Sequence, residues 1–347
     1  MCSTSPTTRS PPKSPHGPMS SSSRRRRSWP VSLSSPGWAG EPTPPAHPGA
    51  APGRAEVPAA VRRLHRRGRR WPSVVGRTRP YRPRTAVRMT DNDDERLLSR
   101  LADSMGTAQA ARVRDYLHWG KDNYAADRIL GDQIREVYPR VGTAIQAARA
   151  FHHRATETLA RDGIRQFLDI GAGLDPVVHV VAQREIPDAE VVYVDNDPIV
   201  LCHGRAESSN DFVHWHAGDL EDPQGILERA RKWLDFAQPV AVSLVGVIEL
   251  VPGQSHALRW VRALLAPLAA GSALVLCTAT PDHATELIDD VAQVYARGGI
   301  LYRPRTRDQV AAFFERLVVD EPGIFTPTLG NATVADVSTY AAIGRKP

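Results

Sequence analysis

The sequence predicts an α/β fold, a Rossmann-like doubly wound sheet that is mostly parallel and carries helices on both faces. Apolar runs of strand length alternate with amphipathic helical patterns from residue 164 onward. The first run leads into Asp169-x-Gly171-x-Gly173, which is typical of a tight turn from a strand into a helix beneath a ligand. Two further runs, 318–319 and 338–344, close the chain, and we expect them to add an antiparallel C-terminal edge.

Residues 1–88 differ in composition from the rest of the chain. They contain 18 Lys and Arg against two Asp and Glu, although the whole chain of 347 residues has a formal net charge of only +6. Such a segment, rich in Pro and Ser, has too little apolar surface to offset the entropy of ordering it. A nucleic-acid-binding arm and a targeting peptide both fit this composition. We favour a third hypothesis, that the native chain starts at Met89 and the segment before it is upstream sequence.

These observations divide the chain into three parts. We expect a disordered tail over 1–88, an N-terminal helical cover over 89–163 and a ligand-binding domain over 164–347. Cys2, Cys202 and Cys277 have no paired spacing, which predicts reduced thiols and a cytoplasmic protein. No apolar run approaches the roughly 20 residues of a membrane span, so no membrane partner is expected.

The cover is predicted to be helical over 94–117, 125–137 and 143–162. Gly120 is expected to stop the first helix, and Asp122 or Asn123 to cap the second. Thr143-x-x-Gln146 is a capping-box pattern that would open the third. The stretch from Lys121 to Tyr124 is either a capped loop or part of a lid over the ligand.

The remaining elements follow from the same periodicities. A long segment over 323–335 is expected to be an irregular surface loop or a wall beside the ligand. Strands are predicted over 167–170, 191–195, 212–216, 240–245 and 273–279, and helices over 177–184, 199–206, 224–234, 255–268, 282–296 and from Thr306 onward.

The glycine turn favours a ligand without a diphosphate. A dinucleotide site has a third small residue, which allows the helix and strand to pack closely while the helix N-terminus meets the phosphates. Here Pro176 occupies that position, and the carboxylate of Asp175 beside it would repel a diphosphate. An NAD(P)-dependent oxidoreductase is therefore the weaker alternative.

Carboxylates follow four of the predicted strands, which favours a positively charged ligand at the sheet edge. Asp197-Pro198 already caps the following helix, so Asp195 is not needed as a cap and could bind ribose hydroxyls. Asp219 or a neighbouring amide could bind adenine. S-adenosyl-L-methionine has these groups and a sulfonium charge. The candidate cofactor-binding residues are Asp169, Gly171, Ala172, Gly173, Asp195, Asn196, Asp219, Leu220, Lys121, Asn123 and Tyr124.

Three motifs in order resemble an actinobacterial family of S-adenosyl methyltransferases within the class I methyltransferases. They are the stretch 111–128 with its Gly-Lys-Asp-Asn core, the turn Gln166 to Gly171 and the strand end Tyr193 to Pro198. The resemblance covers about residues 94–347 and implies the cofactor and the class I fold. Two departures are Asp175 between Leu174 and Pro176, where the family tends to have Leu-Pro, and Glu249-Leu250, where it often has His-Phe.

Methyl transfer is an in-line displacement that needs a general base only when the acceptor is protonated. Glu249 follows the fourth strand and is our candidate base or acceptor contact, unless it faces solvent. His214 and His216 alternate on a strand and are interpreted as structural. We thus predict an S-adenosylmethionine-dependent methyltransferase acting on a small molecule, with no nucleic-acid partner for the core domain. A non-catalytic regulatory protein that binds the same cofactor is the alternative from another class.

Overall fold

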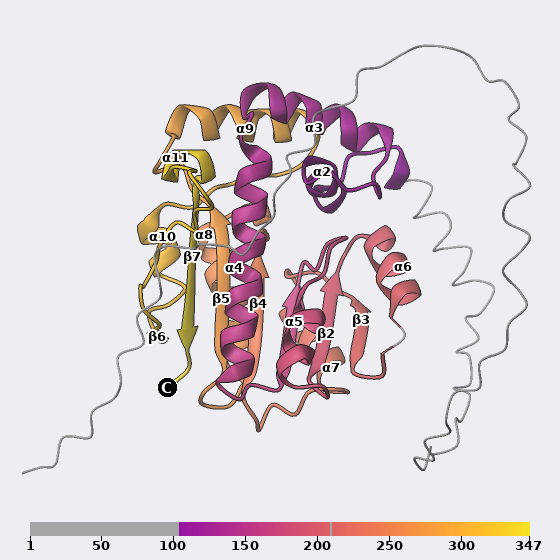
Figure 1. Ribbon diagram of the computed structural model, residues 1–347, viewed down its shortest axis with the longest axis vertical. Coiled ribbons are helices and arrows are strands. Elements are labelled where there is room, and N and C mark those ends of the chain that lie inside the picture. The colour runs from indigo at the N-terminus through magenta and orange to yellow at the C-terminus, as the bar shows by residue number, and fades with distance from the viewer. Residues whose placement is uncertain (1–103, 209) are drawn as a thin grey trace, which may run out of the picture. The chain divides into compact units, whose positions relative to one another are not determined.

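The computed structural model describes residues 104–208 and 210–347, so the expectations for residues 1–88 lie outside it. Its central feature is a seven-stranded sheet in the order β3-β2-β1-β4-β5-β7-β6 (Figure 1). The strands are β1 (Gln166–Ile170), β2 (Glu190–Asp195), β3 (Val213–Ala217), β4 (Val240–Val245), β5 (Ala273–Ala279), β6 (Val318–Val319) and β7 (Thr339–Arg345).

The pairing confirms the predicted class of sheet. Strands β1 to β5 run parallel to one another, whereas β7 runs antiparallel to both β5 and β6. The antiparallel strand therefore lies at the C-terminal edge of the sheet, with the two-residue β6 outside it. β1 is central and buried along its whole length, so the glycine turn that follows it emerges in the middle of the sheet edge.

Helices cover both faces of the sheet, as the alternation of patterns predicts. One hydrophobic cluster joins α7, α8 and α10 to one face, and a second joins α4, α5 and α6 to the other. Neighbouring strand residues belong to different clusters, as with Phe167 and Leu168, because side chains alternate across a strand. These helices are α4 (Val141–Arg161), α5 (Val178–Glu185), α6 (Pro198–Glu207), α7 (Pro223–Ala230), α8 (Gln254–Leu265) and α10 (Arg307–Ala311).

The cover has its own cluster of buried side chains. Val113 and Leu117 of α2 (Ala110–Leu117) and Ile134 of α3 (Ala125–Val137) pack with Ile288 and Val291 of α9 (Thr285–Arg297). Figure 1 shows α3 and α9 lying across one end of the sheet, with α2 beside them. Within the cover, α2 and α3 are thus anchored to the sheet domain through α9, whereas α4 packs on the sheet itself.

Several predicted helix boundaries in the cover are wrong. α4 begins at Val141 after Arg140, so Thr143 lies inside the first turn and its amide donates to the Arg140 carbonyl (2.9 Å) instead of forming a capping box. Tyr124, not Asp122 or Asn123, is the N-cap of α3. Among the described residues, the helix predicted over 94–117 is interrupted by a turn before Ala110, where α2 begins, whereas its predicted end at Leu117, before Gly120, agrees with the structure.

Other local predictions are confirmed or refined. Thr306 and Gln309 form the expected capping box of α10, and Asp197 caps α6 by accepting from the Ile199 amide (2.8 Å). The segment 323–335 contains the start of a short helix, α11 (Val334–Val337), opened by an unforeseen capping box at Thr333. In the described part of the chain, no helix has the length and apolarity to cross a membrane.

Candidate functional site

A cavity of about 890 Å³ lies at the carboxyl ends of the parallel strands. Its lining combines the turns after β1, β2, β3 and β4 with the end of β5 and residues of α2, α4 and α9. That volume is near the top of the range of about 300–1,000 Å³ for small-molecule sites. The cavity is therefore large enough to accommodate a cofactor together with a small second ligand.

The glycine turn forms the floor of the cavity. Gly171 and Gly173 have φ values of 73° and 65°, a region that side chains other than glycine rarely occupy. A Cβ at Gly171 would collide with the side chain of Val247. Gly171 and Gly173, with Ala172 between them, line the cavity. The turn thus lets a ligand approach the backbone closely.

Asp195 lies at the end of β2, is 6% exposed and lines the cavity. Its Oδ2 accepts a hydrogen bond from the Gly173 amide (3.0 Å), and its Oδ1 accepts one from the Asp197 amide (2.9 Å). Burial raises the pKa of Asp195 to about 6. Each oxygen keeps acceptor capacity, so the carboxylate is fixed in position and can still bind hydroxyl groups.

Asn196, Asp219 and Leu220 line the cavity beside Asp195, at the ends of β2 and β3. The Asn196 amide donates to Asp219 Oδ2 (2.7 Å), and the Glu221 backbone amide donates to Asp219 Oδ1 (2.9 Å). Asn196 and Asp219 are exposed, whereas Leu220 is buried. This part of the cavity therefore offers a polar edge beside an apolar side chain, which suits a flat heteroaromatic group.

Asp169 and His152 form a buried pair that faces the cavity, with His152 Nε2 3.7 Å from Asp169 Oδ1. His152 Nε2 has no hydrogen-bond partner among the described residues. Burial, followed by the charge of Asp195, raises the pKa of Asp169 well above its usual range. Burial, with the charges of Arg114 and Arg149, lowers the pKa of His152 to about 3. Nothing in the local sequence around His152 indicated this position.

Replacing Asp169 by Asn is expected to raise the melting temperature at pH 8. The pKa of Asp169 is higher in the folded than in the unfolded chain, so the folded protein binds this proton more tightly. This proton contributes fully to the free energy of unfolding when the pH is below the pKa of Asp169 in the unfolded chain. The contribution is lost as the pH rises through the pKa of Asp169 in the folded chain. Thermal unfolding should therefore show a gain for D169N at pH 8 that shrinks toward pH 5; a constant gain would contradict this.

Glu249 lies in the short 3-10 helix η2 (Ile248–Leu250), is 6% exposed and lines the cavity. Thr278 Oγ1 at the end of β5 donates to Glu249 Oε2 (2.9 Å). Burial raises the pKa of Glu249, and hydrogen bonds to the carboxylate, including that from Thr278, and then the charge of Arg114 partly oppose that rise. The interpretation of Glu249 as a solvent-facing carboxylate is therefore wrong.

Arg114 of α2 is a cavity residue that the sequence did not single out. Its Nη1 lies 2.7 Å from the position that a Cβ of Gly246, just after β4, would occupy. Its charge acts on the pKa of both Glu249 and His152, and all three residues line the same cavity. Among residues 104–208 and 210–347, no hydrogen bond or ion pair to the Arg114 side chain is found. This guanidinium can therefore bind an anionic group.

The structure separates the residues of the Lys121–Tyr124 stretch. Lys121 is exposed and lines the cavity, but Asn123 and Tyr124 do not reach it. The side-chain Nδ2 of Asn123 donates to Asp115 Oδ2 (2.9 Å), and the backbone amide of Tyr124 donates to Asp127 Oδ2 (2.8 Å). Both residues therefore shape the turn into α3, and proximity in sequence to Lys121 was not enough to bring them to the cavity.

His214 and His216 on β3 lie outside the cavity lining. The His214 ring stacks on Trp233 with 3.6 Å between centroids, and its Nε2 lies 2.9 Å from Glu190 Oε2. Trp233 Nε1 donates to His216 Nε2 (3.0 Å). These contacts agree with the structural role predicted for both histidines.

Comparisons with known proteins relate most of the described chain to a protein family and to two solved structures. A family model described as S-adenosyl methyltransferase matches residues 99–347. A solved DUF574 family protein from Streptomyces avermitilis MA-4680 is 36% identical, covers 70% of this chain and 99% of its own, and has a TM-score of 0.67. A protein described as a candidate methyltransferase from Thermobifida fusca YX is 33% identical, with 70% and 96% coverage and a TM-score of 0.66. A comparison with curated proteins finds no match.

Proposed function

We propose that this chain, which belongs to the S-adenosyl methyltransferase family and uses S-adenosyl-L-methionine, methylates a small-molecule acceptor. The observation that carries the proposal is one cavity that joins the glycine turn and Asp195 to a buried acid, Glu249. The cofactor supplies an electrophilic methyl group on a sulfonium. The protein has to hold the cofactor, exclude water and receive a proton from the acceptor.

The residues of the cavity fit this cofactor. Asp195 would bind the ribose hydroxyls, and the edge formed by Asn196, Asp219 and Leu220 would hold the adenine. Gly173 leaves room for the amino-acid end, because a Cβ there would project into open space, whereas a Cβ at Gly171 would collide with Val247 and distort the turn. Asp169, 3% exposed, supplies a carboxylate that would ionise in the presence of a cationic ligand.

On the acceptor side, we propose that Glu249 accepts the proton that the acceptor loses. Its buried position and raised pKa bring it closer to the working range of a general base at neutral pH. Tyr295 of α9 and Tyr302 stack on each other with 4.5 Å between ring centroids, and both line the cavity with Ile288 and Val291. This apolar wall favours an acceptor with a hydrophobic or aromatic body.

Arg114 would bind the carboxylate at the amino-acid end of the cofactor, because arginine and carboxylate form charge-assisted hydrogen bonds. Replacing Arg114 by Gln should weaken S-adenosylhomocysteine binding about 10-fold. Binding of 5′-methylthioadenosine, which lacks the amino-acid end, should change less than twofold. Calorimetric titration of both ligands checks this. Equal losses for the two ligands would contradict the assignment.

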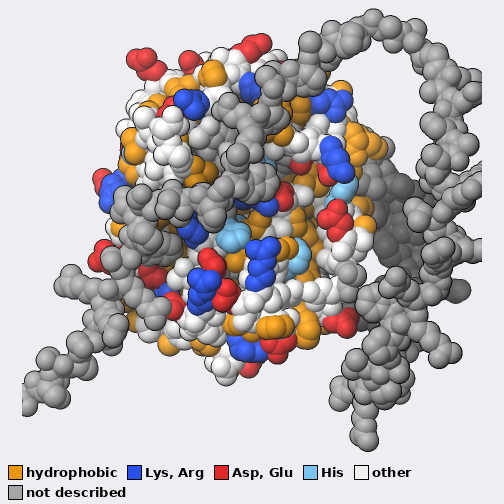
Figure 2. All heavy atoms as spheres, in the orientation of Figure 1, with side chains coloured by type: hydrophobic (Ala, Val, Ile, Leu, Met, Phe, Trp, Pro, Cys, Tyr) orange, Lys and Arg blue, Asp and Glu red, His pale blue; other side chains and the backbone are white. Residues whose placement is uncertain are grey.

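A small acceptor is also favoured by the charge distribution. Residues 89–347 contain 36 Asp and Glu against 26 Lys and Arg. Acidic and basic side chains are interspersed on the face shown in Figure 2. We therefore propose no nucleic-acid partner for this part of the chain. Cys202 and Cys277 are free thiols, which fits the cytoplasmic location we propose.

We further propose that residues 89–163 act as a cover for the cofactor domain over 164–347. Arg114, Lys121 and His152 of the cover line the same cavity as the strand-end residues, which supports this division.

Titration of the full chain with S-adenosylmethionine, S-adenosylhomocysteine and NAD tests the proposed function. We expect binding of the first two without NAD; tight NAD binding without sulfonium binding would overturn it.

A further inference from the structure

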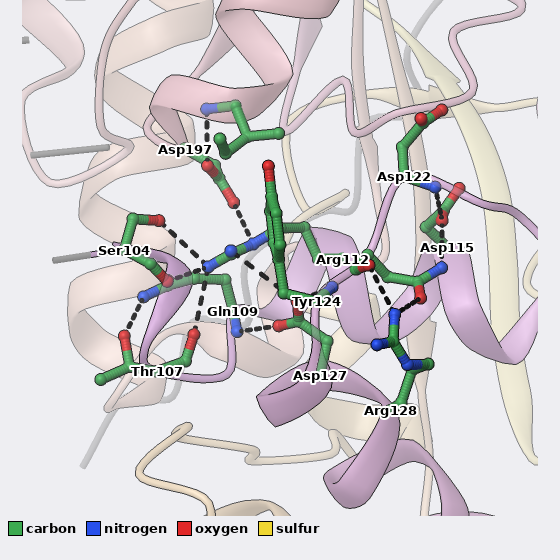
Figure 3. Close-up of polar contacts among 12 residues, drawn as sticks. Ser104, Thr107, Gln109, Arg112, Asp115, Asp122, Tyr124, Asp127, Arg128 and Asp197 are labelled. Atoms are coloured by element: carbon green, nitrogen blue, oxygen red, sulfur yellow. Dashed lines mark hydrogen bonds and ion pairs between the residues drawn. The ribbon is translucent and has the colours of Figure 1, made fainter. Parts of the chain in front are cut away.

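Arg112 of α2 is the centre of a buried polar network between the cover and the sheet domain (Figure 3). Its side chain is 0% exposed. Its Nη2 donates to the Ser104 carbonyl (2.8 Å), to Ser104 Oγ (3.0 Å) and to the Thr107 carbonyl (3.2 Å). These bonds fix the guanidinium against the turn that precedes α2.

Two buried carboxylates from different parts of the fold face this guanidinium. Asp127 Oδ2 of α3 lies 3.7 Å from Arg112 Nη1, and Asp197 Oδ2 after β2 lies 3.1 Å from Arg112 Nε. Asp127 also accepts from the amides of Gln109 (2.9 Å) and Tyr124 (2.8 Å), so it ties the starts of α2 and α3 together. Asp197, in contrast, belongs to the turn that carries the cofactor-site carboxylate.

The network continues from Asp197 into the cofactor site. The Asp197 amide donates to Asp195 Oδ1, and the Gly173 amide donates to Asp195 Oδ2. Asp197 Oδ1 meanwhile caps α6 at Ile199. The guanidinium of Arg112 is thus connected through one residue to the carboxylate that we assign to the ribose. Arg112 itself does not line the cavity.

We propose that Arg112 is a positioning residue, which holds Asp197 and through it Asp195 in the orientation that binds the cofactor ribose. The same guanidinium also contacts Asp127, which joins α2 and α3. One side chain therefore fixes the position of both the cover helices and the ribose carboxylate. This inference rests on the proposed function, because it assumes the cofactor at Asp195. Removing one partner from a buried ion group leaves the others uncompensated, so Arg112 affects stability as well.

The test separates positioning from stability through a double-mutant cycle. In the full chain, R112K keeps the charge but cannot keep the bonds of the planar guanidinium. We expect R112K to weaken S-adenosylhomocysteine binding about 10-fold, measured by calorimetry on folded protein. In a D195N background, the same change should cost less than twofold, because its target is already lost. The double variant is compared with each single variant at one temperature.

Arg128→Lys is the matched control, since Arg128 is an exposed cover arginine whose Nη1 donates to the Asn123 carbonyl (2.8 Å). It should leave S-adenosylhomocysteine binding within twofold. An R112K protein that melts earlier but binds normally would overturn the proposal, as would equal losses in the wild-type and D195N backgrounds. If R112K fails to fold, Asp197→Asn takes its place in the cycle with the same expectations. Wild-type protein that binds no S-adenosylhomocysteine would instead refute the proposed function, and this inference with it.

Discussion

Replacing Asp195 by Ala is expected to weaken S-adenosylhomocysteine binding about 100-fold or more. Hydrogen bonds to a charged group contribute about 1.5–3 kcal/mol each, and we assign two ribose hydroxyls to this carboxylate. The substitution also leaves the Gly173 and Asp197 amides without their acceptor, which loosens the glycine turn. Calorimetric titration of the two proteins measures the loss.

Glu249→Ala is the comparison for this result. Glu249 lines the cavity but accepts from Thr278 rather than from the glycine turn, so its loss should change S-adenosylhomocysteine binding less than about threefold. Asp195→Asn separates charge from shape, since Asn can accept at one oxygen only. Equal losses for D195A and E249A would show that the ribose assignment is misplaced.

Glu249→Gln should lower methyl transfer about 100-fold or more while S-adenosylhomocysteine binding is kept. General base catalysis contributes roughly 100- to 10,000-fold, and Gln keeps the shape of Glu without its basicity. Since burial raises the pKa of Glu249, the wild-type rate should rise with pH as this carboxyl ionises, and the variant should lack that rise. Transfer of labelled methyl from the cofactor to a small-molecule cell extract measures both.

A matched control for this variant is Glu286→Gln, because Glu286 is an exposed carboxylate in the first turn of α9. Its activity should equal that of the wild type. Full activity in E249Q would exclude Glu249 as the base. That result would leave Glu249 as an acceptor contact at most.

The sheet was largely predictable because its strands are short apolar runs with polar ends. The predicted bounds of β4 and β5 agree with the structure, since both strands are buried on both faces. Asp169, Asp195, Asp219 and Glu249 were predicted at strand ends, and all four line one cavity. Parallel topology brings the carboxyl ends of strands to one edge, so position in sequence was enough here.

The cover was less predictable, because the roles of its side chains depend on contacts distant in sequence. Arg112 and Arg114 are two positions apart on α2, yet one is buried against Asp197 and the other faces Gly246. His152 meets Asp169 only because α4 packs along the sheet. Helical periodicity identifies an apolar face, but it does not tell which polar side chain points toward a cavity formed by other elements.

In the loop before α3, the sequence assigned residues to the cavity that the structure places outside it. Lys121, Asn123 and Tyr124 were grouped because they are adjacent, but Asp115 and Asp127 draw the latter two away from the cavity. Two carboxylates from neighbouring helices satisfy the backbone and amide groups of this turn. A polar stretch of this kind is shaped first by its own hydrogen bonds, and only its remaining side chains are available to a ligand.

Methyl transfer to a small molecule is tested most directly by one labelling measurement. The full chain is incubated with methyl-labelled S-adenosylmethionine and an extract separated into small molecules, protein and nucleic acid. We predict that label enters the small-molecule fraction and that Asp195→Ala abolishes this incorporation. Label that appears only in protein or nucleic acid, or that stays on the cofactor in every fraction, would contradict the account.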